Sequence, residues 1–143
     1  MARRRFQTKI TRARFVVSPF SSEQMAALGQ TGVDSIQARL ERGQNVSDQP
    51  AAPLAKRYQA YKARRSPPAI RNWRLSGRTL GALRVLRANE NRAVIGFSDP
   101  EAGRRAAINN RRERQFGLSP ANWRDVLEAV RRFRFARAER RVA

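Results

Sequence analysis

The sequence predicts an α+β fold: a small antiparallel sheet packed with about four helices, with a basic N-terminal leader and a basic C-terminal tail. Apolar residues recur at helical spacing behind recognisable caps, and one pair of short alternating segments flanks a turn. The 143 residues, 41% of them hydrophobic, suffice for one modest core. We therefore expect a basic leader and first strand over 1–19, a single core domain over 20–130, and an Arg-rich helix end or tail over 131–143.

The first segment opens with basic residues and then alternates. Phe6, Thr8 and Ile10 are separated by polar neighbours, and an apolar run precedes Pro19. Alternation of this kind is typical of a strand with one buried face.

The first helix has the clearest signals. Ser21 is the expected N-cap, and Gln24 three residues later completes a capping box. Gly43 is the expected stop. Gly29 and Gly32 weaken the middle of the helix, or else allow another backbone to approach closely. The apolar positions at helical spacing are Met25, Leu28, Val33, Ile36 and Leu40.

Turns and short elements follow. The polar stretch 43–53 predicts a loop, and 54–65 predicts a helix that Pro67-Pro68 ends. A short helix is expected over 77–83. Next comes a hairpin, with apolar positions up to Ala88 on one strand, 93–97 as the other, and a three-residue turn of Asn89, Glu90 and Asn91.

Two capped helices complete the prediction. Asp99-Pro100 predicts a helix to about Asn110, with apolar points at Ala102, Ala106 and Ala107, and Ser119-Pro120 predicts the last helix. The segment from Arg111 to Gly117 is interpreted as a basic, exposed connector. The expected core face of the last helix consists of Trp123, Val126, Leu127, Val130 and Phe133.

The charge balance is unusual. The chain has 31 basic and 11 acidic residues, a formal net charge of +20, and only Lys9, Lys56 and Lys62 are lysines. A biased codon usage can account for the preference for Arg over Lys, but it does not account for the scarcity of Asp and Glu. Such a charge favours polyanions or acidic protein surfaces as partners, and Arg binds phosphate and carboxylate in a bidentate manner.

The composition disfavours an enzyme. There is no Cys and no His, so the commonest general base and transition-metal ligand are missing. The carboxylates are scattered singly, and the closest pairs, Asp99/Glu101 and Asp125/Glu128, suit helix N-termini. No phosphate-binding glycine loop occurs. We expect no catalytic residue, metal site or cofactor, and no apolar run long enough to cross a membrane; a metal-dependent nuclease with acids from distant positions remains as an alternative.

Two clusters combine basic and aromatic residues. Tyr58 and Tyr61 stand among lysines and arginines, and so do Phe133 and Phe135. Aromatic rings that stack on bases while Arg neutralises phosphate would give this pattern in a nucleic-acid-binding surface. Phe133 also continues the apolar face of its helix, which favours a core position, whereas Phe135 lies off that face.

One succession of motifs resembles a known family. Leu75-Ser76-Gly77-x-x-Leu80-x-x-Leu83 precedes a strand, a turn and Val94-Ile95-Gly96-Phe97, and a helix then leads to Arg114-Gln115-Phe116-Gly117-Leu118-Ser119. This order resembles the phage virion morphogenesis proteins, which act in tail completion and head–tail joining, and it covers about 20–130. The family's Tyr-Ala-x-x-His-x-Gly stretch is replaced here by Ala106–Asn110, and the basic C-terminal extension is unusual.

The resemblance implies a ring-forming neck, tail-terminator or connector protein of the virion, made in the host cytoplasm. Its partners would be the portal-side connector, tail proteins, further copies of itself and genome DNA in the lumen, with no membrane. The basic leader and tail would be arms that order on assembly. The residues expected to contact polyanions or partners are Arg3, Arg4, Arg5, Arg64, Arg65, Arg111, Arg112, Arg114, Arg131, Arg132, Arg134, Phe135, Arg137, Arg140 and Arg141.

A second hypothesis comes from the charge alone. A nucleoid-associated or RNA-associated basic protein would show the same composition. It would bind free DNA or RNA as a monomer or dimer in a salt-sensitive way, whereas the virion hypothesis requires a closed oligomer.

Overall fold

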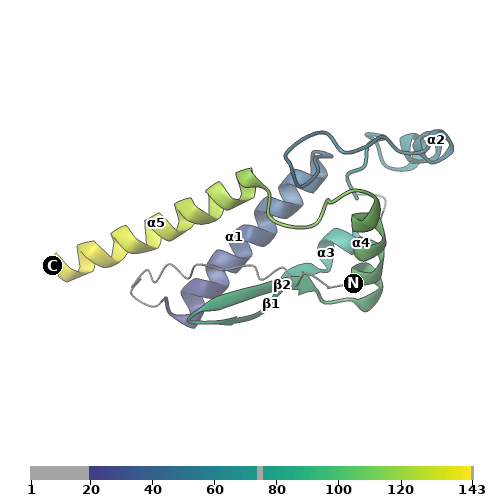
Figure 1. Ribbon diagram of the computed structural model, residues 1–143. Coiled ribbons are helices and arrows are strands. Elements are labelled where there is room, and N and C mark those ends of the chain that lie inside the picture. Colours follow the sequence, from purple (N-terminus) through teal and green to yellow (C-terminus); the bar gives the residue numbers. More distant parts are fainter. Residues whose placement is uncertain (1–19, 74–75, 143) are drawn as a thin grey trace, which may run out of the picture.

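The predicted α+β class is confirmed by the computed structural model, which describes residues 20–73 and 76–142, the side chains only as far as Arg134 in the last helix. The strand and basic leader predicted over 1–19 lie outside the described residues. Five helices and one two-stranded antiparallel sheet are described (Figure 1). In chain order they are α1 (Ser22–Glu41), α2 (Lys56–Arg65), α3 (Arg78–Gly81), β1 (Leu83–Asn89), β2 (Arg92–Phe97), α4 (Pro100–Arg112) and α5 (Pro120–Val142).

Helix α1 begins and ends where the sequence predicts. The Ser21 hydroxyl accepts from the backbone N–H of Gln24 at 3.1 Å, and the Gln24 side chain accepts from the backbone N–H of Ser21 at 3.0 Å. This is the reciprocal capping box that satisfies two otherwise unpaired donors. Gly43 follows the helix with a φ of +71°, a conformation that glycine adopts without strain.

The two glycines within α1 allow the hairpin to approach its backbone. A Cβ on Gly29 would lie 2.8 Å from the Cβ of Ala93 and 2.9 Å from a methyl group of Val85. A Cβ on Gly32 would meet Ile95 at 3.0 Å. The close-approach interpretation of these glycines is therefore confirmed.

The hairpin is present, with a tighter turn than predicted. Asn89 pairs with Arg92, so the turn holds two residues instead of three. The register shifts between Val85 and Arg87, which leaves Leu86 as an extra residue on β1. Bulges of this kind twist and bend a ribbon locally.

The core is formed between α1, α3, the hairpin and the segment after α4. Its buried centre consists of Val33, Ile36, Leu40, Leu80 and Leu83. Phe116 packs edge-on against Trp73, with ring centroids 4.8 Å apart, and against Phe97 at 5.1 Å. The prediction of an exposed connector over 111–117 is therefore wrong in its second half: Phe116 belongs to the core margin and Gln115 is fully buried.

Helix α4 has the predicted cap and most of the predicted apolar face. Asp99 accepts from the backbone N–H of Glu101 at 3.1 Å, Pro100 is the first helical residue, and the helix runs slightly past the expected end. Ala102 and Ala106 are buried, whereas Ala107 is exposed and was wrongly placed on the apolar face. Helix α2 begins at Lys56, two residues later than predicted, and ends ahead of Pro67-Pro68 as expected.

Helix α5 packs against α1 (Figure 1), next to the hairpin: a Cβ on Gly32 of α1 would lie 3.0 Å from Ile95 of β2 and 3.8 Å from Val126 of α5. Its cap is reciprocal, because Asn122 N–H donates to the Ser119 hydroxyl and Ser119 N–H donates to the Asn122 side chain, both at 3.1 Å. The helix continues unbroken through the 130/131 boundary to Val142. The predicted core face is wrong at Trp123 and Leu127, each 52% exposed.

Candidate functional site

A buried arginine joins α1 to the segment that precedes α5. Arg39 is fully buried, and its guanidinium donates to the carbonyls of Gln115 at 2.6 Å, Gly117 at 2.9 Å and Gln44 at 3.1 Å. Nε donates to the Asn122 side chain at 3.0 Å. Burial lowers the pKa of Arg39, and nearby Asp48 acts in the opposite direction. The side chain fixes the start of α5, so its role is structural.

Asp48 secures the same junction from the loop after α1. It accepts from the backbone N–H of Ala121, in the first turn of α5, at 3.0 Å. The hydrogen bond from the Ser119 hydroxyl is the main cause that holds the pKa of Asp48 below its ordinary value; burial opposes it, while the Ala121 N–H and the positive charge of Arg39 support it. The base of α5 is thereby held by buried polar contacts.

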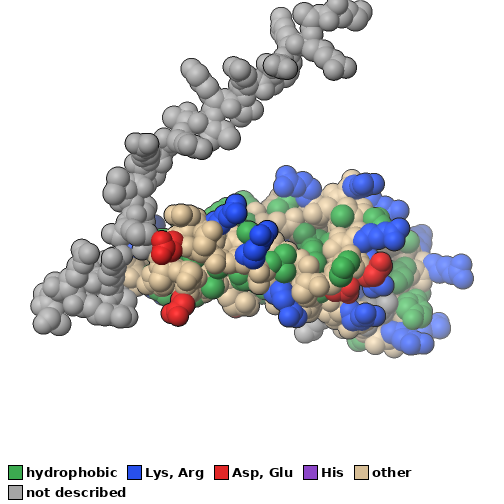
Figure 2. All heavy atoms as spheres, turned by 90° about the horizontal axis from the view of Figure 1, so that it is seen from below, with side chains coloured by type: hydrophobic (Ala, Val, Ile, Leu, Met, Phe, Trp, Pro, Cys, Tyr) green, Lys and Arg blue, Asp and Glu red, His purple; other side chains and the backbone are tan. Residues whose placement is uncertain are grey.

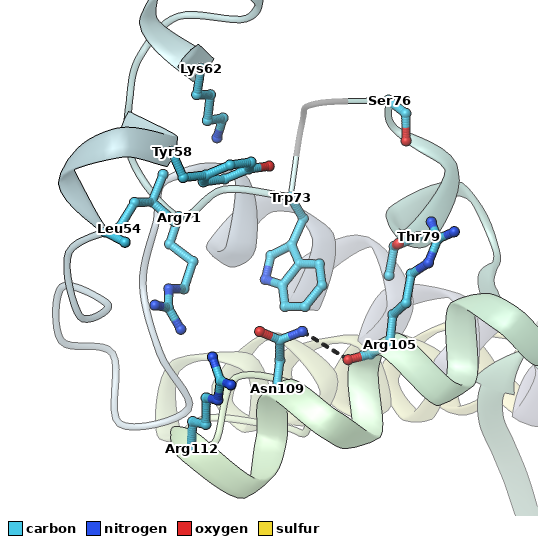
Figure 3. A pocket seen from close by; sticks show the side chains of 11 residues that line it. Leu54, Tyr58, Lys62, Arg71, Trp73, Ser76, Thr79, Arg105, Asn109 and Arg112 are labelled. Carbon is cyan, nitrogen blue, oxygen red and sulfur yellow. Dashed lines mark hydrogen bonds between the residues drawn. The ribbon is translucent and has the colours of Figure 1, made fainter. Parts of the chain in front are cut away.

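A basic pocket adjoins this junction, between α2, α4 and the segment that leads to α3 (Figure 3), and Trp73 of its lining donates to the Gln115 side chain at 2.6 Å. It is a cavity of about 450 Å³, and no carboxylate occurs among the described residues that line it. Its lining consists of Leu54, Ala55, Tyr58, Lys62, Arg71, Trp73, Ser76, Thr79, Arg105, Asn109 and Arg112.

One face of α4 supplies part of the pocket wall. Arg105, Asn109 and Arg112 recur at intervals of four and three residues, so they share a face of the helix. Ala102 and Ala106 lie on the buried face that packs toward the core. Asn109 donates to the backbone carbonyl of Arg105 at 2.9 Å, and neither guanidinium of this face forms an ion pair among the described residues.

Lys62 links α2 to the segment that contains Arg71. Its ammonium group, which is buried, donates to the carbonyl of Ile70 and to the side chain of Asn72. Burial lowers the pKa of Lys62. These contacts fix the residues on either side of Arg71, so Lys62 positions that side chain.

Arg71 carries an unsatisfied donor at the wall of the pocket. Its Nε is buried and has no hydrogen-bond partner in the described part of the chain. The charge of Arg71 acts on the carboxylate of Glu113. Burial raises the pKa of Glu113. Hydrogen bonds from Asn45, Ala52 and Gln115, together with the positive charge of Arg71, outweigh burial and bring that pKa below its ordinary value. Figure 3 shows the head groups of Arg71 and Arg112 turned toward each other across the cavity.

Exposed aromatic rings continue from the pocket along α2. Tyr58, at the rim, is 40% exposed, and Tyr61 is 46% exposed. Their ring centroids are 6.2 Å apart, and the guanidinium of Arg65 lies 5.4 Å from the centre of the Tyr61 ring. A cation at this distance from an aromatic ring is attracted to it.

The predicted contact residues fall into separate regions. Two of them, Arg64 and Arg65, are the last residues of α2. Two more, Arg111 and Arg112, are the last residues of α4, and Arg114 follows that helix. All five side chains are exposed. Of these, only Arg112 lines the pocket. Figure 2 shows basic side chains crowding the end of the molecule that carries α4, with few acidic ones on this face.

The remaining predicted residues belong to the other end of the molecule or to undescribed parts. Arg131, Arg132 and Arg134 are exposed on α5, and Arg132 pairs with Glu128 of the same helix at 2.6 Å. The predicted C-terminal arm, 131–143, coincides with the end of this helix as far as Val142. Arg137, Arg140 and Arg141 lie in its last turns without described side chains, as does Phe135, and Arg3, Arg4 and Arg5 lie outside the described residues. Phe133 is half-buried, in keeping with its place on the apolar face.

Sequence reasoning missed Arg39, Arg71 and Arg105. Arg39 had a detectable signal, because it falls three residues after Ile36 on the apolar face of its helix. The pocket residues had no comparable signal, since three separate segments supply them.

Comparisons with known proteins give no identification: no protein-family model, curated protein or solved structure matches the chain. Among the described residues, no helix has the length and apolar character needed to cross a membrane. Likewise, no three acidic side chains gather into a possible metal site within the described parts.

Proposed function

We propose that this chain is a non-enzymatic structural protein of a tailed-phage virion that acts in head-to-tail joining, as a neck, tail-terminator or connector-ring subunit. The observation that carries the proposal is the uncovered face of α5. Trp123 and Leu127 each expose 52% of their surface on a helix that extends beyond the rest of the described chain (Figure 1). Large apolar side chains left exposed together mark an interaction surface.

The motifs that resemble the phage family support this proposal. Leu80, Leu83, Phe97, Phe116 and Leu118 come from three separate motifs, yet all belong to one core cluster. Gly77, in the first motif, has the φ of +69° that a glycine turn provides before α3. The resemblance therefore describes residues that act together in folding.

We infer that the occupant of the α5 face is a second copy of this chain. Leu86, on the hairpin bulge, is 46% exposed and offers a different apolar surface on the same molecule. Contact between two unlike surfaces is heterologous and closes into a ring when the rotation permits. The net charge of +20 opposes association, so salt, DNA in the lumen or acidic neighbours would be needed to screen it.

The test is molar mass by light scattering at high salt, with and without short duplex DNA. The wild-type chain is expected to form a closed oligomer of about six or twelve copies. Trp123→Ser/Leu127→Ser should be monomeric with an unchanged melting temperature. Tyr58→Ser/Tyr61→Ser, which removes two comparably exposed rings elsewhere, should still assemble. A wild-type monomer under both conditions, or assembly by the α5 variant, would contradict the proposal.

The exposed tyrosines of α2 favour a second candidate function, nucleic-acid binding. The exposed Tyr58–Tyr61 pair with Arg65 over Tyr61 combines aromatic faces with positive charge, as surfaces that bind single-stranded nucleic acid do. A nucleic-acid-binding protein, such as a nucleoid or RNA-associated factor, would bind free strands as a monomer or dimer. Light scattering of the complex separates this function from ring assembly.

A further inference from the structure

We propose that the pocket between α2 and α4 binds a nucleotide, with its phosphate held by Arg71 and Arg112, its base against Tyr58, and Arg105 on the other side of the cavity beside Thr79. The ligand could be a free nucleotide or one unit of a single strand. The proposal does not depend on the virion function, because it rests on the lining of one cavity.

The arginines of the cavity have no carboxylate partner in its described lining. Among the described residues, Arg105 and Arg112 make no ion pair, and no carboxylate lines the cavity. Figure 3 shows the head groups of Arg71 and Arg112 directed toward each other, and an anion between them would relieve the repulsion of these like charges. Because Lys62 is occupied by Ile70 and Asn72, the arginines are the groups left for a ligand.

One buried donor at the cavity lacks a partner among the described residues. The Nε of Arg71 is buried without an acceptor in the described structure, and a buried unsatisfied donor is costly. The atom is closed to solvent in the described structure, so an oxyanion in the cavity would supply the acceptor once the Arg71 side chain turns toward it. A phosphate suits the two guanidiniums of Arg71 and Arg112 better than a single carboxylate does, because it carries more charge and three strong acceptor oxygens.

Aromatic rings line the cavity. Trp73 forms the back of the cavity and Tyr58 its rim (Figure 3). A cavity of about 450 Å³ lies within the range of small-molecule sites, which combine apolar walls with a few directed polar groups. Beyond the rim, Tyr61 and Arg65 extend the same combination along α2, so a strand could continue outward from the pocket. An acidic peptide would account for the arginines but not for this row of rings.

The test uses Trp73 as a local reporter. The chain has two tryptophans, so Trp123→Phe leaves Trp73 as the only one. In this background, thymidine monophosphate and a twelve-nucleotide oligothymidylate are titrated at about 0.3 M salt, where interactions of exposed charges are largely screened. The pocket variant is Arg105→Gln/Arg112→Gln. The matched control is Arg104→Gln/Arg111→Gln, which removes the same charge from exposed positions of the same helix that do not line the cavity.

Both ligands should change Trp73 emission, and the pocket variant should weaken binding by about tenfold or more while the control changes it by less than about twofold. Binding of the mononucleotide indicates a free-nucleotide site; a response to the oligonucleotide alone indicates a strand. Tyr58→Ala should also weaken binding, which keeps the test decisive if the double variant unfolds. The proposal would be overturned if the two arginine double variants lost the same amount of affinity, or if Trp73 emission responded to neither ligand. Tighter binding of an oligoglutamate peptide than of the nucleotides would also overturn it.

Discussion

Arg39 donates to the backbone carbonyl of Gln115 at 2.6 Å, although 76 residues separate them in the chain. Both residues are fully buried, and no carboxylate of the described residues is hydrogen-bonded to the guanidinium. Four separate oxygens share its donors instead. The contact explains how the polar, basic segment between α4 and α5 becomes part of the interior. Its backbone carbonyls accept hydrogen bonds from Arg39, which lies on the apolar face of α1.

Replacing Arg39 should therefore destabilise the fold. In Arg39→Met the carbonyls of Gln115 and Gly117 and the Asn122 side chain lose their donors, and each buried unsatisfied group costs about 1–3 kcal/mol. We expect a loss of about 3 kcal/mol or more in the free energy of unfolding, measured by chemical denaturation. Arg42→Met, one turn along and exposed, is the control and should change it by less than about 0.5 kcal/mol. An equal effect of both variants would show that charge, and not the hydrogen bonding, matters.

Gly29→Ala should lower stability because no space exists for a side chain. The new Cβ would lie 2.8 Å from Ala93 and 2.9 Å from Val85, so the hairpin would have to move away from α1. Overpacking of this kind costs about 1–3 kcal/mol. Gly81→Ala is the matched control, because nothing lies within 4 Å of its Cβ and alanine favours a helix. Thermal unfolding should show a loss for the first variant and no loss for the second.

The elements that the sequence predicted well are those with local signals. The Ser21 capping box, the Asp99-Pro100 cap and the Ser119-Pro120 cap each depend on residues within one turn, and each is present. The hairpin strands were found from alternation, but the turn length was wrong by one residue. Turn length is set by pairing across the strands, here Asn89 with Arg92, which the alternation alone does not specify.

The features that the sequence did not predict depend on how segments distant in the chain pack against one another. Trp123 and Leu127 have the spacing of a core face, yet α1 covers only part of α5 and leaves them exposed. Gln115 is buried because Arg39 reaches it from another helix. The pocket combines α2, α4 and Arg71, and no single stretch of sequence contains that juxtaposition.

Acid should weaken the junction at the base of α5 through Asp48. The folded-state pKa of this carboxyl lies below its ordinary value, so its charged form stabilises the fold above an unfolded-state pKa of 3.8, and the contribution is lost as the pH falls through the folded-state value. Asp48→Asn keeps an oxygen acceptor for Ala121 and suits the φ of +59° at this position.

The variant thus isolates the charge. Denaturation at several pH values should show Asp48→Asn less stable than wild type near neutral pH, with the difference shrinking below about pH 4. A difference that stays constant down to pH 2 would mean that the charge of Asp48 is not what stabilises the junction.

The exposed arginines of α5 should contribute to polyanion binding without supporting the fold. Arg131→Gln/Arg132→Gln/Arg134→Gln removes the ion pair between Arg132 and Glu128, which is solvent-exposed and contributes little to stability. If each arginine neutralises one phosphate, the slope of log K against log salt for duplex DNA should become shallower by about 0.9 per residue. Arg78→Gln/Arg87→Gln/Arg92→Gln removes the same charge from exposed positions at α3 and the hairpin. Equal slope changes in the two triple variants would mean that DNA responds to total charge alone, whereas a change confined to α5 would identify this helix as the surface that binds DNA.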